Sequence, residues 1–189
     1  MKIAFIIYDL MTTLDFAGVY DPITRLNTMG FINELEYDVC SNKKKITTAE
    51  GLEIAADKIL NNLGEYDFIV VPGGEGIKYI AQDKEFIEWI KTAQDKSTIT
   101  SVCGGSLILG IAGLIKDKKA TTHPMLMENL KKFTPYATDN RIVEDGNIIT
   151  ARGVTSSIDL GLFLCEKIAG KEVREKIQKQ MDYLNYNCN

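Results

Sequence analysis

Residues 98–110 read TITSVCGGSLILG, an apolar, strand-like run that stops at Cys103, turns through Gly104 and Gly105, and continues as a helical pattern. Glycines permit such a sharp strand-to-helix turn because they lack a side chain. A cysteine at this turn stands at the lip of a sheet, in the context of a nucleophile elbow, although its neighbours do not match the GxSxG pattern of serine hydrolases. The stretch therefore predicts an α/β protein with a reactive cysteine.

Short apolar runs alternate with helical patterns along the rest of the chain. The unbroken apolar run at residues 67–71 (DFIVV) is typical of a strand buried on both faces, as in a parallel sheet. Asp145-Gly146 and Glu50-Gly51 lie between apolar segments and predict two hairpins. This order predicts a three-layer α/β sandwich. Further strands are expected at residues 2–8, 35–41, 98–103 and 118–124, and helices at 21–29 (capped by Asp21-Pro22), 84–94, 106–115, 124–133, 155–169 and 171–184.

Composition narrows the class of protein. A length of 189 residues with 45% apolar content predicts one domain, residues 1–189, with a real core. A net charge of -4 with scattered basic residues argues against nucleic acid or an anionic membrane as a partner. The first apolar run is too short for a signal sequence or a membrane span. The chain has four widely spaced cysteines: Cys40, Cys103, Cys165 and Cys188. This spacing predicts neither a zinc site nor a disulfide framework, so we expect a reduced, cytoplasmic protein.

Three strand ends carry the residues expected to form a site. Asp15 follows the first strand, Gly73-Gly74 follows the run at 67–71, and Cys103-Gly104 follows the strand at 98–103. In an open parallel sheet these carboxyl ends meet where ligands bind. The following helix N-terminus is expected to lower the pKa of the cysteine and leave a thiolate at neutral pH. Its amides, with one from Gly73 or Gly74, are expected to form an oxyanion hole for a small-molecule substrate.

Each of these residues also has a structural interpretation. Free cysteines are usually small buried hydrophobic residues, and we expect that role for Cys40 and Cys165 but a reactive one for Cys103. Asp15 is expected to act as a general acid and base, although an Asp after a strand is often a cap or turn former. His123, the only histidine, is a candidate partner of the cysteine or a capping residue.

Three segments, in this order, resemble the ThiJ/PfpI superfamily of class I glutamine-amidotransferase-like proteins: DFIVVPGG (67–74), the run from Thr100 to Pro124, and GVTSSIDLGLFLCEKIAG (153–170). The resemblance implies a flavodoxin-like sandwich, a homodimer, and an oxyanion pocket lined by the amides of Gly74 and Gly104. MTTLDFAG (11–18), with SVCGG and KKATTH, is most similar to the isonitrile hydratase branch and to sensor domains of AraC-type regulators. Those regulators carry an additional helix-turn-helix module. Residues 1–189 include no such module, so we expect a freestanding enzyme.

The hydratase branch implies that Cys103 attacks an isonitrile carbon to give a thioimidate, that Asp15 transfers the protons, and that water releases an N-substituted formamide. It also implies that the reaction uses neither a metal nor an organic cofactor. Hydratases commonly have Thr directly after the cysteine, where this chain has Gly104. The superfamily's proteases have His there, so that pairing is excluded. Other activities of the superfamily (glyoxalase or deglycase, amidase or protease-like hydrolase) and a non-catalytic ligand or redox sensor stay open as alternatives.

Overall fold

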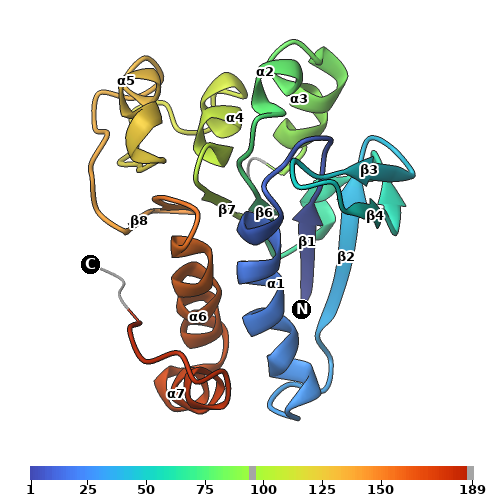
Figure 1. Cartoon of the computed structure of the whole chain (residues 1–189), viewed down its shortest axis with the longest axis vertical. Coiled ribbons are helices and arrows are strands. Elements are labelled where there is room, and N and C mark those ends of the chain that lie inside the picture. The colour runs from blue at the N-terminus through green and yellow to red at the C-terminus, as the bar shows by residue number, and fades with distance from the viewer. Residues whose placement is uncertain (94–96, 187–189) are drawn as a thin grey trace.

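A computed structural model describes residues 1–93 and 97–186. Its main sheet has seven strands within these residues, in the order β5-β2-β1-β6-β7-β9-β8 (Figure 1). Only β8 pairs antiparallel, with β9. The strands of this sheet are β1 (Lys2–Ile6), β2 (Glu36–Ser41), β5 (Lys58–Ile59), β6 (Phe68–Val71), β7 (Thr98–Val102), β8 (Ile142–Asp145) and β9 (Ile148–Ala151). A separate antiparallel hairpin joins β3 (Lys45–Thr47) to β4 (Glu53–Ala55).

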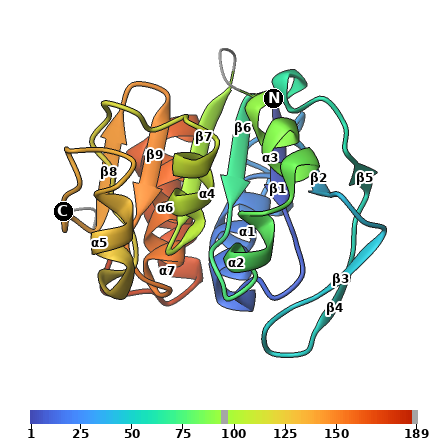
Figure 2. The ribbon, with the colours of Figure 1, turned by 90° about the horizontal axis from the view of Figure 1, so that it is seen from above.

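Helices cover both faces of the sheet, which gives the predicted three-layer sandwich. Figure 2, seen from above, shows α3, α4 and α5 on the viewer's side and α1 and α6 behind the strands. Alternate residues of β1 enter opposite cores: Ile3 and Phe5 pack with α1 and α6, whereas Ala4 and Ile6 pack with α3 and α4. The helices are α1 (Thr13–Thr28), α2 (Ile77–Ile80), α3 (Lys84–Lys91), α4 (Gly105–Ile111), α5 (Met127–Leu130), α6 (Ser156–Ala169) and α7 (Lys171–Gln180), with 3₁₀ turns at Leu63–Glu65 and Pro124–Leu126.

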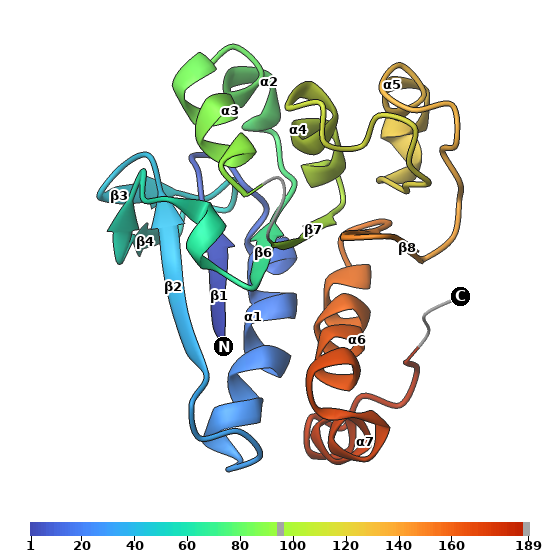
Figure 3. The ribbon, with the colours of Figure 1, turned by 180° about the vertical axis from the view of Figure 1, so that it is seen from behind.

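The first helix differs from its prediction. It begins at Thr13, so Pro22 lies inside the helix and Asp21-Pro22 does not cap it. A proline in a helix interior removes one backbone hydrogen bond, which is why it predicts a helix start. Packing against α6 outweighs this local preference, and Figures 1 and 3 show α1 and α6 side by side. A Cβ on Gly18 would lie 2.1 Å from Ser157 Oγ, so the two helices need a glycine at this contact.

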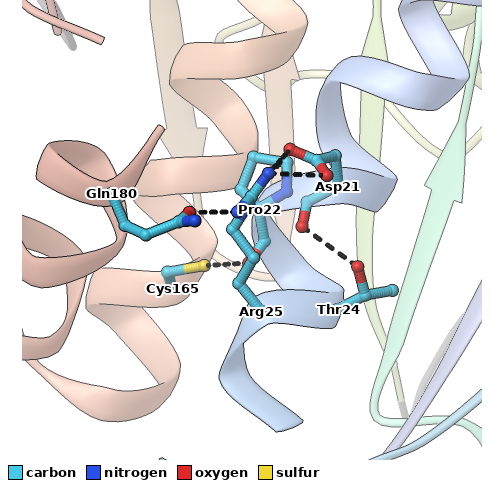
Figure 4. Close-up of polar contacts among 6 residues, drawn as sticks. All are labelled: Asp21, Pro22, Thr24, Arg25, Cys165 and Gln180. Atoms are coloured by element: carbon cyan, nitrogen blue, oxygen red, sulfur yellow. Dashed lines mark hydrogen bonds and ion pairs between the residues drawn. The ribbon is translucent and has the colours of Figure 1, made fainter. Parts of the chain in front are cut away.

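Polar contacts around Pro22 link α1 to both α6 and α7 (Figure 4). The thiol of Cys165 on α6 donates a hydrogen bond to the Pro22 carbonyl at 3.3 Å. Arg25 pairs with Asp21 at 2.9 Å and contacts Gln180 of α7. Cys165 is fully buried, which confirms its predicted structural role.

The structure confirms some of the other predicted elements and contradicts others. Both hairpins are present, and Gly170, at φ +88°, separates α6 from α7. The strand predicted at 118–124 is wrong: the segment makes only an isolated bridge between Ala120 and Ala137, because β8 occupies the sheet edge. The helix predicted at 124–133 is a 3₁₀ turn followed by the short α5. The predicted end of another helix at Gln94 lies outside the described residues. No helix in the described part of the chain is long and apolar enough to span a membrane.

Candidate active site

Cys103 occupies a strained turn between β7 and α4. Its φ is +55°, in the left-handed region that residues other than glycine seldom adopt. The Cys103 N–H donates to the Ala151 carbonyl at 3.0 Å, and the Thr122 hydroxyl donates to the Cys103 carbonyl at 2.9 Å. Neighbouring elements therefore hold the backbone in this conformation. Strain of this kind at a strand-to-helix turn is the geometry of a nucleophile elbow.

Asp15, in the first turn of α1, lies against this cysteine. Its Oδ2 accepts a hydrogen bond from the Gly73 N–H at 2.9 Å. The carboxyl group and the Cys103 thiol are close enough that each affects the pKa of the other. The carboxyl group is fully buried, and its Oδ1 has no hydrogen-bond partner among the described residues. The Thr12 N–H donates to the Gly73 carbonyl at 2.9 Å, which fixes the start of α1 to this loop. The structure thus brings together the acid and the cysteine predicted from sequence.

Two glycines make this close approach possible. A Cβ on Gly73 would lie 2.5 Å from the Gly104 nitrogen and 2.9 Å from Asp15 Oδ2, so a larger residue would push the acid from the cysteine. Gly74 has φ +137°, and a Cβ there would lie 2.5 Å from the Leu10 carbonyl oxygen. Only glycine fits at both positions without a shift of backbone.

The protonation states of the pair follow from their burial. Burial raises the pKa of Asp15 to about 7, opposed by the Gly73 hydrogen bond and reinforced by the negative charge of Glu50. Burial and then the neighbouring Asp15 raise the pKa of Cys103 to about 12, opposed by the Gly104 N–H. The expectation of a thiolate at neutral pH is therefore wrong for the free protein. One amide at the start of α4 does not compensate for desolvation and an adjacent acid.

The three predicted amides have different positions in this site. The Gly73 N–H is already bonded to Asp15, so it orients the acid. The Gly104 N–H points to the cysteine sulfur, where it lowers the pKa of the thiol. The Gly74 amide lies on the opposite loop, where Gly74 bridges to Met11. An oxyanion-binding role for Gly74 and Gly104 stays a prediction.

His123 lies at the start of the 3₁₀ turn at Pro124–Leu126. Its Nδ1 accepts a hydrogen bond from the Met125 N–H at 3.3 Å, so it caps this turn, as one of the two interpretations expected. Among the described residues no hydrogen bond or ion pair joins it to Cys103 or Asp15. Its participation in catalysis stays a prediction.

The other two cysteines that the structure describes lie in the core. Cys40 and Cys165 are buried, and burial raises their pKa values to about 11 and about 12. Within residues 1–93 and 97–186 no group of three His, Cys, Asp or Glu side chains is placed to hold a metal ion. Cys188 lies outside the described residues.

Two further residues near the pair were not predicted from the sequence. Tyr8, fully buried just after β1, donates from its hydroxyl to the Pro72 carbonyl at 2.9 Å, and it is close enough to Asp15 and Cys103 that they help burial to raise its pKa. Glu50, in the β3–β4 hairpin, accepts from the Thr13 N–H at 3.0 Å and from its hydroxyl at 2.5 Å. Tyr8 could have been found from its place at a strand end. Nothing in the sequence connects Glu50 to a helix that begins 37 residues earlier.

This fold and site define a class of protein: a flavodoxin-like α/β sandwich in which an elbow cysteine stands beside a buried carboxylic acid. The sequence profile of the DJ-1/PfpI family matches residues 1–167. The chain belongs to the DJ-1/PfpI family.

Several relatives are similar over most of the chain. The isonitrile hydratase of Pseudomonas putida is 30% identical over 97% of this chain and 78% of that protein. Protein DJ-1alpha of Drosophila melanogaster is 31% identical over 82% of this chain and 70% of its own length. The crystal structure of a ThiJ/PfpI family protein from Pseudomonas syringae superposes with a TM-score of 0.86 at 30% identity, covering 97% of this chain and 75% of that one.

Proposed function

We propose that this protein hydrates an isonitrile to an N-substituted formamide, with Cys103 as nucleophile and Asp15 as proton carrier. The observation that carries the proposal is the buried pair, in which a carboxyl group with a pKa of about 7 lies against the cysteine sulfur. The isonitrile hydratase of Pseudomonas putida, 30% identical over nearly the whole chain, supports this substrate class. We also propose that the protein is cytoplasmic and forms a homodimer.

The first step uses the proton that the pair holds at neutral pH. An isonitrile carbon accepts both a nucleophile and a proton, so the sulfur and the proton of the thiol both become bonded to this one carbon. The Asp15 carboxylate takes the thiol proton as the sulfur–carbon bond forms, and it delivers that proton to the same carbon. The product is a thioimidate, R–N=CH–S–Cys103, and Asp15 is again ionised. A carboxyl group with a pKa near the working pH is suited to both transfers.

The second step releases the product with one water. Water adds to the thioimidate carbon, and Asp15 takes a proton from it. Asp15 delivers this proton to the nitrogen. The carbon–sulfur bond then breaks as the proton of the added hydroxyl passes to the sulfur, and R–NH–CHO leaves with the Cys103 thiol restored. The amides of Gly74 and Gly104 are proposed to hold the oxygen as the tetrahedral carbon forms. Water and isonitrile are the only reactants, so atoms and electrons balance.

The test is production of a formamide from methyl isonitrile, measured by NMR, with methylglyoxal and acetamide presented in parallel. Formamide formation that is lost in Cys103→Ala and in Asp15→Asn supports the proposal. The matched control is Cys165→Ala, which changes a buried cysteine remote from the pair and should retain activity. Formamide production that survives in Cys103→Ala contradicts the mechanism. Turnover of methylglyoxal or acetamide alone contradicts the assigned reaction.

A further inference from the structure

A cleft lies beside the Cys103 turn, and of the residues that line it only Gly74 has a role in the chemistry above. The cleft has a volume of about 430 Å³ between α2, α4 and α5, within the size range of small-molecule sites. Its rim carries charged and polar side chains, Lys78 and Lys132 among them. Its walls are hydrocarbon, supplied by Ile77, Ala81, Leu107, Ile111, Leu126 and Phe133.

The cleft adjoins the cysteine turn at two glycines. Gly74, at the end of the loop that holds Asp15, lines the cleft directly. Gly104, next to the cysteine, is covered by two residues of the cleft wall. A Cβ on Gly104 would lie 2.4 Å from Ile77 Cδ1 and 3.0 Å from Leu126 Cδ1. These two side chains make this flank of the cysteine turn apolar.

We propose that this cleft binds the hydrocarbon substituent of the isonitrile, an inference that rests on the proposed function. The isonitrile carbon must reach the sulfur of Cys103, so the substituent on its nitrogen must leave the site along a wall. Ile77 and Leu126 provide an apolar wall that begins at Gly104 and continues into the cleft. Residues that line the cleft away from the cysteine, such as Ala81 and Ile111, then set the substituent length that is preferred.

The test compares straight-chain isonitriles from methyl to n-hexyl. Full burial of a methylene is worth roughly fourfold in binding, so we expect kcat/KM to rise about two- to fourfold per carbon. Ala81→Phe places a ring in the cleft at an exposed residue beyond the end of α2. It should lower kcat/KM for n-hexyl isonitrile by about tenfold or more and leave methyl isonitrile within about twofold. Gln82→Phe, at the next exposed residue and outside the cleft, should change neither value.

Binding of N-hexylformamide to the same proteins, followed by NMR, separates this inference from the proposed function. Weaker binding in Ala81→Phe than in Gln82→Phe supports the cleft, even if no isonitrile is hydrated and the proposed function fails. Hydration of methyl isonitrile with no dependence on chain length overturns the cleft and leaves the proposed function standing. Equal formamide binding by both variants also overturns the cleft.

Discussion

Replacing Asp15 with Asn should make the protein more stable above pH 4 while abolishing activity. The carboxyl group of Asp15 is fully buried, and its Oδ1 has no partner among the described residues. Ionising it therefore costs more in the folded protein than in water. Asparagine has nearly the same shape, and its side-chain oxygen can still accept the Gly73 N–H. The substitution removes the charge and keeps the geometry.

The magnitude follows from the shift in the pKa of Asp15, from 3.8 to about 7. Between these values the unfolded chain has released the proton and the folded protein still holds it, so the folded state binds more protons. The free energy of unfolding of the wild type therefore falls as pH rises, by about 1.4 kcal/mol per pH unit. Over the whole shift the loss is about 4 kcal/mol. Above the folded pKa both states are ionised and the loss stays constant.

Urea unfolding at pH 4, 6 and 8 measures this difference directly. Asp15→Asn and wild type should have similar free energies of unfolding at pH 4. At pH 8 the free energy of unfolding of the variant should be about 4 kcal/mol higher than that of the wild type. Asp21→Asn on the same helix is the matched control, because it removes only an ion pair with Arg25 that is worth less than about 1 kcal/mol. An Asp15→Asn variant that is less stable at pH 8, or whose advantage does not change with pH, refutes the reasoning.

Three further predictions concern the pH dependence and the packing. For wild type, kcat/KM for isonitrile hydration should rise with pH through about 7, as Asp15 ionises, and should not fall until well into the alkaline range, where Cys103 loses its proton. Glu50→Gln removes a negative charge near Asp15 and should move that midpoint to lower pH, with the carboxyl ¹³C shift following; an unchanged midpoint contradicts the coupling. Gly18→Ala should lower the free energy of unfolding, measured by urea unfolding, by about 1–3 kcal/mol, because its Cβ would lie 2.1 Å from Ser157 Oγ. An unchanged free energy of unfolding would contradict this, because it would mean that α1 and α6 move apart without cost.

Much of the fold could be predicted because its signals are local. A continuous apolar run such as residues 67–71 marks a strand buried on both faces, and Asp145-Gly146 marks a hairpin. The elbow at Cys103 is also local, since a strand, two glycines and a helix follow one another. Asp15 could be placed beside the cysteine because parallel strands end at one edge.

The features that escaped prediction depend on contacts between distant segments. The true start of α1 was hidden because Pro22 is a start signal by itself, and only the packing against α6 explains its place in the interior. The pKa of Cys103 depends on burial, which the residues next to it do not reveal. Glu50 reaches α1 only because the hairpin folds over the first turn of that helix.

The most direct test of the Cys103–Asp15 pair is the mass of the Cys103 peptide after wild-type protein is mixed rapidly with methyl isonitrile and quenched. No atom is lost when the thiol adds to the isonitrile carbon, so the peptide should gain the mass of one intact isonitrile. That gain should be absent in Asp15→Asn and on the peptides of Cys40 and Cys165. Formamide production with no modified Cys103 at any time point would contradict the account.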